Sequence, residues 1–288
     1  MISERGSFMN ITVLTENTAG DPTLTAEHGL SLLIRYKDHC ILLDAGQSDC
    51  FARNARQMGI DLGQVQTAVL SHGHYDHGGG LATFFAQNAY APVYAADGYD
   101  RPFFFHTDSS TRSIGVPASV LSHKERFLAV REPVSIADGI WLLPHSTPGL
   151  SAIAQRAHLF RQSDGGLIPD DFSHELSLVF CLDQGLVICN SCSHSGLEVI
   201  LREVRQQFPE QPLLAFCGGL HMRAKKHDAE ACLYSREEVR NLADCIRSCG
   251  LQRIYTGHCT GAIAMKWLKE ELGDRVVPLT AGLRFTIE

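Results

Sequence analysis

No stretch of this chain approaches the roughly 20 consecutive apolar residues of a membrane-spanning helix, so the sequence predicts no membrane span and no membrane partner. The first residues, Met1 to Phe8, also lack the long apolar segment of a secretion signal. The 288 residues contain no Pro/Ser-rich linker, internal repeat or low-complexity block. We therefore expect a soluble, cytoplasmic protein with a single domain, residues 1–288, that is long enough to bury a full core.

An excess of positive charge is also absent. The formal net charge is -7, and no basic stripe interrupts the sequence. A dedicated nucleic-acid surface normally needs such a stripe, so we expect no nucleic-acid partner. Local basic residues can still oppose the global sign, which leaves an anionic small molecule as the expected partner.

Cysteine is plentiful, with 10 residues, but nothing in its distribution indicates a disulfide framework. The cysteines are scattered through core-like apolar runs such as Val179-Phe180-Cys181, and reduced thiols in the cytosol fit this pattern better. Cys189-x-x-Cys192 and Cys245-x-x-x-Cys249 suggest a zinc knuckle. Neither has a second, well-spaced pair to complete four ligands.

Histidine is concentrated in one segment. His72-Gly73-His74-Tyr75-Asp76-His77 follows the apolar run Ala68–Leu70 and precedes Gly78–Gly80. Neutral imidazole nitrogens and carboxylate oxygens are ordinary ligands of zinc, iron and manganese. His72 and His74 point to the same side of an extended segment, while Asp76 and His77 can turn toward a second ion. The segment therefore predicts a pair of metal ions, because a histidine-rich surface turn would explain neither the Asp-His pair nor the glycines.

Short apolar runs alternate with stretches of helical spacing, which is typical of a layered α/β fold. The expected strands are 11–14, 30–35, 40–44, 68–71, 92–95, 140–143, 176–181, 186–190, 213–217 and 253–257. The expected helices are 50–58, 81–87, 196–207, 236–249 and 263–272.

The His72–His77 segment matches HxHxDH, the signature of the metallo-β-lactamase fold superfamily, at every position. The preceding run Cys40-Ile41-Leu42-Leu43-Asp44-Ala45-Gly46 is similar to the strand and Asp-x-Gly turn that precede the signature in that superfamily. The resemblance implies an αββα sandwich and a site for two divalent metal ions.

The remaining ligands should also lie where strands end, because rigid strand ends place loop side chains reproducibly. His194 and His258 both stand in Gly/Ser/Thr-rich turns after apolar runs. The expected ligand sets are His72, His74 and His194 for one ion, and Asp76, His77 and His258 for the other.

Further motifs resemble one branch of the superfamily, the 7,8-dihydropterin-6-yl-methyl-4-(β-D-ribofuranosyl)aminobenzene-5'-phosphate synthase-like proteins. They are Glu16-Asn17-Thr18, Glu27-His28-Gly29-Leu30-Ser31, Cys192-Ser193-His194, Gly218-Gly219-Leu220-His221 and His258-Cys259-Thr260-Gly261. This similarity spans almost the whole chain and specifies the fold and metal site better than the substrate, because one fold serves many reactions.

Two departures from the superfamily pattern bear on the site. Thr147-Pro148-Gly149 is followed by Leu150, where many superfamily hydrolases have a ligand histidine. His194 has to substitute, and nearby His145 is the alternative. The bridging aspartate has no obvious counterpart. Cys192 stands at a comparable strand end, where a thiolate can bind or approach a metal, although a small buried thiol is an equally good explanation.

Hydrolysis is the default chemistry of such a site. A water between two metals would lose a proton near neutral pH and become the nucleophile, and the same ions would stabilise charge on a carbonyl or phosphoryl oxygen. Asp76 would orient the metal and the water, and Asp44 would accept the N–H of a ligand imidazole. His221 would bind an anionic oxygen or donate a proton. Glu27, His28 and Arg223 are the remaining candidates for substrate contact.

Two classes of function remain. The first is a hydrolase, or a pterin-related synthase or transferase, acting on a small phosphorylated or cyclic substrate. The second is a di-iron redox or non-catalytic metalloprotein on the same fold. Di-iron members of the superfamily generally carry glutamate where this chain has His74, so zinc is favoured over iron, with manganese as another alternative. The segment Tyr99–Phe105 is either a lid able to stack on a planar ring or a helix packed in the core.

Overall fold

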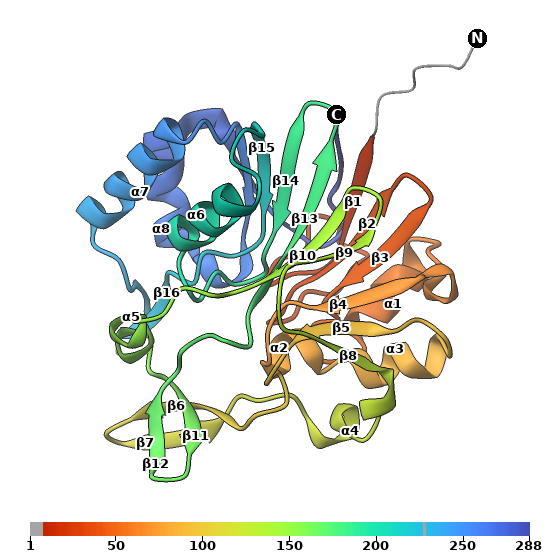
Figure 1. Cartoon of the computed structure of the whole chain (residues 1–288), viewed down its shortest axis with the longest axis horizontal. Coiled ribbons are helices and arrows are strands. Elements are labelled where there is room, and N and C mark those ends of the chain that lie inside the picture. Colours follow the sequence, from red (N-terminus) through yellow and green to blue (C-terminus); the bar gives the residue numbers. More distant parts are fainter. Residues whose placement is uncertain (1–7, 227–228) are drawn as a thin grey trace.

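Two seven-stranded β-sheets face each other and carry helices on their outer faces (Figure 1). The structure is a computed structural model that describes residues 8–226 and 229–288. The strands of the first sheet, in spatial order, are β20 (Arg284–Ile287), β1 (Met9–Thr15), β2 (Ser31–Tyr36), β3 (His39–Leu43), β4 (Thr67–Leu70), β5 (Val93–Ala96) and β8 (Phe127–Val130). Those of the second are β19 (Val276–Pro278), β18 (Arg253–Thr256), β15 (Leu213–Cys217), β14 (Gly185–Cys189), β13 (Leu176–Leu182), β10 (Ile140–Pro144) and β9 (Val134–Ala137).

Helices cover the outer face of each sheet. The first sheet packs against α1 (Cys50–Gln57), α3 (Leu81–Gln87) and α4 (Ala118–Leu121). The second packs against α6 (Leu197–Gln207), α7 (Arg236–Ser248) and α8 (Ala262–Leu272). Two short helices, α2 (Tyr75–Gly78) and α5 (Ser151–Arg156), and four single turns of 3₁₀-helix, Leu62–Gln64, Lys124–Arg126, His258–Thr260 and Gly273–Arg275, complete the helical part. No helix in the described ranges is long and apolar enough to cross a membrane.

The strands read as continuous apolar runs because both faces of each sheet are buried. In β2, Leu32 and Ile34 point into the core between the sheets, while Leu33 points toward the helices of the first sheet. In β14, Val187 and Ile188 divide between the two sides in the same way. Alternate side chains of a strand point to opposite faces, so this burial pattern produces the αββα sandwich that the sequence predicts.

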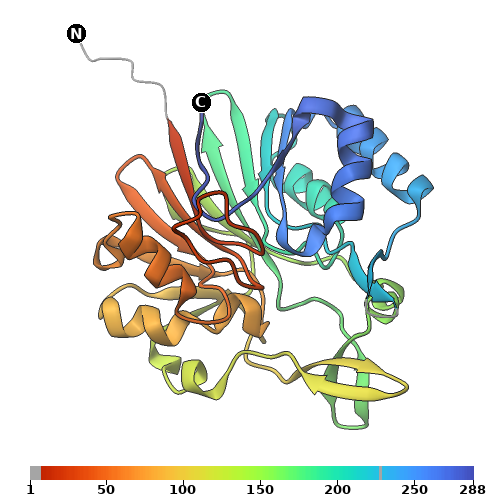
Figure 2. The same ribbon diagram turned by 180° about the vertical axis from the view of Figure 1, so that it is seen from behind.

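Two small sheets lie outside the sandwich. One contains β12 (Gly166–Pro169), β11 (Leu159–Ser163), β6 (Phe103–Thr107) and β7 (Ser110–Ser113), and the other pairs β16 (Arg223–Lys226) with β17 (Ala229–Cys232). The four-stranded sheet projects from one end of the sandwich, near α5 and β16, in both views (Figures 1 and 2). The segment 99–105 does not form the helix that was one of its two expected forms: it is a turn followed by the start of β6, in which Tyr99 and Phe103 are nevertheless buried.

Parallel pairing brings the chemically active loops to one edge of the sandwich. β3, β4 and β5 are parallel neighbours in the first sheet, and β14, β15 and β18 are parallel neighbours in the second. The loops that follow parallel strands in a sheet emerge at the same edge, where ligands of such sheets usually bind. The His72–His77 segment follows β4, His194 follows β14 and His258 follows β18.

Candidate metal centre

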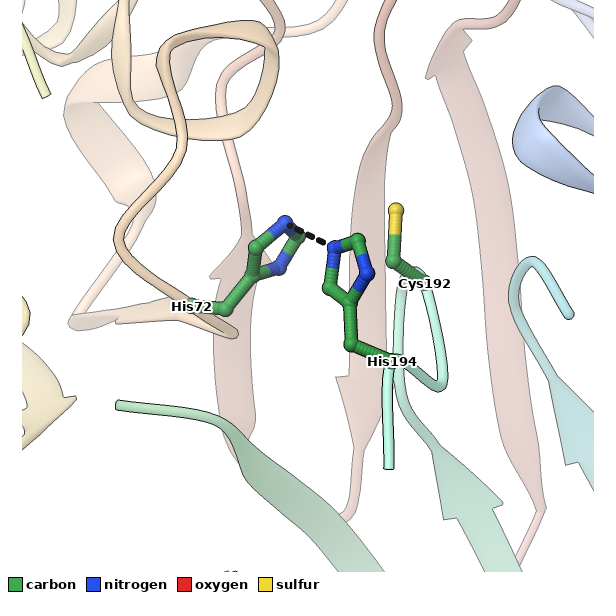
Figure 3. Close-up of side chains that lie close together, drawn as sticks. All are labelled: His72, Cys192 and His194. Carbon is green, nitrogen blue, oxygen red and sulfur yellow. Dashed lines mark hydrogen bonds between the residues drawn. The ribbon is translucent and has the colours of Figure 1, made fainter. Parts of the chain in front are cut away.

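Three buried histidines form the first half of the site. His72 and His74 come from the loop after β4, and His194 comes from the loop after β14. His194 Nε2 lies 3.2 Å from His72 Nε2, a contact that Figure 3 marks with a dashed line. The His74 ring centroid lies 4.6 Å from that of His72 and 4.8 Å from that of His194. The two sheets thus bring the first expected ligand set into one cluster.

The second half contains Asp76, His77 and His258. His77 Nε2 lies 3.2 Å from His258 Nε2. Asp76 Oδ2 lies 3.4 Å from His258 Nε2 and 3.7 Å from His77 Nε2. The two imidazoles are completely buried, and only 12% of the Asp76 side chain is exposed. The second expected ligand set is therefore also assembled from both sheets.

Cys192 lies between the two halves. Its Sγ is 3.2 Å from His77 Nε2. It also belongs to two compact groups of potential ligand atoms, one with His72 and His194 and the other with His77 and His258, in each of which all atoms lie within 4.8 Å of one another. Burial raises the pKa of the Cys192 thiol well above its usual range, so a nearby cation would be needed to form the thiolate.

Neighbouring side chains hold the second nitrogen of three of these imidazoles. His77 Nδ1 lies 2.8 Å from Asp44 Oδ2, and His258 Nδ1 lies 2.9 Å from Asn17 Oδ1. His72 Nδ1 lies 2.8 Å from the hydroxyl of Ser71, which itself donates to Asp44. Histidines that bind metals usually have such a partner on the other ring nitrogen, which sets the tautomer and the ring orientation.

Two opposed nitrogens at the centre fit a cation between them. The Asp44 carboxylate and the Asn17 amide oxygen can each accept a hydrogen bond from Nδ1, of His77 and His258 respectively, and in a neutral ring that donates from Nδ1 the Nε2 atom carries a lone pair. Two lone pairs 3.2 Å apart repel each other unless a cation lies between them. Burial by itself would lower the pKa of His77, but the Asp76 and Asp44 carboxylates outweigh it and raise that pKa to about 9. The position therefore attracts positive charge, either a proton or a metal ion.

The three histidines of the first half are in the neutral form that metals bind. Burial lowers the pKa of His74 to about 3, and it lowers the pKa values of His72 and His194 well below their usual range. His74 Nε2 and His194 Nδ1 are buried without a hydrogen-bond partner in residues 8–226 and 229–288. Asp76 supplies a negative charge to the site. Burial would raise the pKa of its carboxyl, but His77, His258 and His28 outweigh that effect and hold the pKa well below the usual range. The donor set fits divalent metal ions.

Two buried glutamates, which the sequence did not single out as site residues, hold the backbone of the later ligands. Glu175 Oε1 accepts the His194 N–H at 2.7 Å, and Glu175 Oε2 accepts from the N–H and hydroxyl of Ser195. Glu16 accepts the N–H of His258 and that of Thr18. Glu16 belongs to a motif that resembles the superfamily branch, which is the one sequence signal for either residue. Each ligand-bearing turn is thus fixed by a carboxylate from another part of the chain.

A second unforeseen pair supports the histidine-rich loop. His174 Nε2 lies 2.9 Å from Asp170 Oδ2, and its Nδ1 accepts the N–H of Gly73 at 2.9 Å. The His174 ring packs 3.9 Å from the Phe103 ring, between centroids. Asp170 and His174 are buried and orient the backbone between His72 and His74.

The proposed substrate contacts fall in different places. His28, His221 and Arg223 line a cavity of about 750 Å³ that opens over the metal centre. His28 Nε2 lies 3.2 Å from Asp76 Oδ2, and the His221 ring lies 4.1 Å from the His194 ring, between centroids. Glu27 does not line this cavity, because it accepts from the hydroxyl of Ser48.

His145, the alternative third ligand, faces away from the cluster. Its Nδ1 lies 3.0 Å from Glu203 Oε1, which also accepts the backbone N–H groups of Ser146 and Thr147. His194 occupies the position beside His72 instead. The turn that lacks a histidine after Gly149 is thus held by a carboxylate of α6 and takes no part in the cluster.

Comparison with known proteins agrees with the fold. The model of the metallo-beta-lactamase superfamily matches residues 24–158, which include the His72–His77 segment. A crystal structure described as Tm1679, a metal-dependent hydrolase of the beta-lactamase superfamily, superimposes with a TM-score of 0.78 over 97% of this chain and 99% of that one, at 24% identity. Zn(2+)-bound PqqB from Methylobacterium extorquens superimposes with a TM-score of 0.57 over 96% of this chain and 99% of that one, at 12% identity.

The chain thus has the metallo-β-lactamase fold, and this fold implies binding of divalent metal ions. In sequence it is similar to the 7,8-dihydropterin-6-methyl-4-(beta-D-ribofuranosyl)-aminobenzene-5'-phosphate synthase of Methanocaldococcus jannaschii. The two sequences are 26% identical over 303 residues, which cover 98% of each.

Proposed function

We propose that this chain is a hydrolase dependent on two metal ions, most simply zinc, that acts on a small anionic substrate, phosphorylated or pterin-related. The observation that carries the proposal is the pair of nitrogen contacts, His72 with His194 and His77 with His258, each 3.2 Å long and each joining the two sheets. His72, His74 and His194 would hold one ion, and Asp76, His77 and His258 the other. Cys192, within reach of both sets, would take the place of the missing bridging aspartate.

Bound divalent ions would supply an activated water and would polarise the oxygen of the scissile group. The side chains around them divide the remaining tasks. Asp76 accepts from His28 and faces His258, so it can orient the nucleophile and pass a proton on. His221, whose Nδ1 is buried without a partner in the described part of the chain, lies at the cavity wall and can bind an anionic oxygen or donate a proton.

A pterin-phosphate synthase or transferase is the second candidate. The similarity to the Methanocaldococcus jannaschii synthase supports it, because that similarity extends over nearly the full length of both chains. The same metal centre and cavity would serve such a reaction.

Elemental analysis together with hydrolysis of bis(4-nitrophenyl) phosphate tests the proposal. We expect about two zinc or manganese ions per chain in the wild-type protein, as in two-metal hydrolases. Replacing His77→Ala should remove about one ion and lower kcat/KM by more than the roughly 10–100-fold loss typical of residues that only support a ligand. His39→Ala is the matched control, because His39 lies on β3 beside Asp38, outside the cluster.

Wild-type protein with little metal, or His77→Ala with full activity, would contradict the proposed site. Two iron ions without hydrolysis would instead favour the redox alternative. Hydrolysis that needs metal but is slow on phosphodiesters, combined with turnover of a pterin substrate, would favour the synthase.

A further inference from the structure

The cavity above the metal centre extends to a second, differently built wall. That wall contains the apolar side chains of Phe105, Leu159 and Leu233 and three cationic side chains, Arg112, Arg223 and Lys225. Asp76 is the one carboxylate among the described lining residues, and it belongs to the metal centre. A chain with a net charge of -7 therefore has a cavity that is basic away from its metal ligands.

Arg112 is more available to a ligand than Arg223 is. It lies on β7 directly opposite Phe105 on β6, and its guanidinium carbon is 5.0 Å from the centroid of the Phe105 ring. Arg112 is exposed and forms no ion pair with any residue in 8–226 or 229–288. The Arg223 guanidinium, by contrast, already lies 3.4 Å from Glu230 Oε2.

The half-buried Phe105 ring gives this position a second property. Its neighbours include His158, 5.6 Å away between ring centroids, and the apolar cavity wall. A guanidinium binds phosphate and carboxylate groups by paired hydrogen bonds and also stacks on aromatic rings. One ligand that carries a planar ring next to an anionic group would satisfy both Phe105 and Arg112.

We propose that Phe105 and Arg112 form a second binding subsite that holds a planar ring and a phosphate group of the substrate, at the end remote from the metal centre. This inference rests on the proposed function, because it places the substrate of that reaction across the cavity. The metal centre acts on one group of the molecule while the β6–β7 hairpin holds another. The hairpin belongs to the projecting four-stranded sheet rather than to the sandwich (Figure 2), so it can set specificity without altering the metal ligands.

Calorimetric binding of benzylphosphonate tests the subsite, because this probe carries a ring and a dianion and cannot be hydrolysed. Titrations would use the zinc-loaded protein and the chelator-treated protein. Arg112→Gln should weaken binding about tenfold, the loss expected for a charge-assisted hydrogen bond, and by the same factor with and without zinc. Arg112→Lys should recover part of the loss, because it keeps the charge and loses the paired geometry.

Phe105→Leu should weaken benzylphosphonate and leave methylphosphonate, which has no ring, unchanged. Arg202→Gln is the matched control for charge, because Arg202 is exposed on α6 and does not line the cavity. The variants change exposed or half-buried side chains, and circular dichroism would verify that they fold.

The outcomes separate the subsite from the proposed function. Binding that disappears with zinc and is indifferent to Arg112→Gln would overturn the subsite and leave the metal site intact. Failure of wild-type protein to bind the probe would also overturn the subsite. A protein that retains no zinc but still loses affinity through Arg112→Gln would support the subsite and contradict the dinuclear hydrolase.

Discussion

At the residue scale, the site depends on buried carboxylates that hold the backbone of the ligand-bearing turns in unfavourable conformations. His258 and Ser193 have φ values of 50° and 52°, in the left-handed region that non-glycine residues rarely adopt. Each such residue costs about 1 kcal/mol or more and persists only where its surroundings impose it. Glu16 and Glu175 do so here, because their buried carboxylates accept the N–H groups of His258 and His194.

We therefore expect Glu175→Gln to damage the metal site from a distance. One side of the amide would present N–H to a backbone N–H of His194 or Ser195, which leaves a buried donor unpaired. The free energy of unfolding should fall by about 1–3 kcal/mol, and zinc affinity should fall by about 10–100-fold. Urea unfolding and a zinc-indicator competition assay measure these changes.

Glu210→Gln is the control for this substitution, because Glu210 is exposed beyond the end of α6. Unchanged zinc affinity in Glu175→Gln would show that His194 keeps its place without the carboxylate.

The same residues mark what the sequence could not predict. His72, His74, Asp76 and His77 lie within six positions of one another, so a local pattern suffices to propose them. Asn17 contacts His258 across 241 positions, and no local pattern connects them. Glu175 lies closer, 19 positions before His194, but buried glutamates have no characteristic spacing from the groups they hold.

At the element scale, the interior strands were predictable and the peripheral hairpins were not. All ten expected strands and all five expected helices are present, with ends that differ by at most two residues. Strands that are buried on both faces consist of nearly continuous apolar residues, so they are easy to recognise in a sequence. β7, Ser110–Ser113, is exposed at every position, and β6 pairs with β11 from a distant part of the chain. A strand that is polar, or that pairs with a distant part of the chain, lacks the local apolar pattern by which strands are predicted from sequence.

The loop after β10 contains an acid-base pair whose contribution to stability should depend on pH. Burial alone would raise the pKa of Glu203, but His145, the N–H group of Ser146 and the hydroxyl group of Thr147 lower it to about 2, from 4.5. Burial alone would lower the pKa of His145, but Glu203 and Glu175 raise it above 6.5. Because its pKa is lowered, the Glu203 carboxylate stabilises the fold fully above pH 4.5, and this contribution is lost as the pH falls toward 2. Because its pKa is raised, the His145 imidazolium stabilises the fold fully below pH 6.5, and this contribution is lost at higher pH.

Glu203→Gln should therefore lower the free energy of unfolding most between pH 4.5 and 6.5, where both effects are complete. We expect a loss of about 1–2 kcal/mol in that range and a smaller loss on either side. Urea titrations of chelator-treated protein across the pH range measure it. Glu198→Gln, an exposed change on the same helix, should show no such maximum. A loss that does not become smaller above pH 6.5 would mean that the charge of His145 contributes nothing and that Glu203 acts through its hydrogen bonds to the loop alone.

At the scale of the whole molecule, each half of the sandwich is incomplete without the other. The first sheet contributes His72, His74, Asp76 and His77, and the second contributes His194 and His258. Both short nitrogen contacts cross from one sheet to the other. A metal ion in either position therefore links the two sheets and binds the native state far more tightly than the unfolded chain.

Metal should accordingly raise the melting temperature of the entire molecule. At a free zinc concentration about 100 times Kd, one site adds about 2.7 kcal/mol, which corresponds to a rise of about 5 °C for a chain of this size. Scanning calorimetry of chelator-treated and zinc-loaded protein should show one transition that moves as a unit. His258→Ala should lose most of the shift, while His106→Ala, a change on the β6–β7 hairpin outside the metal cluster, should retain it. A zinc-dependent shift that His258→Ala keeps in full would mean that no stabilising ion is bound between His77 and His258.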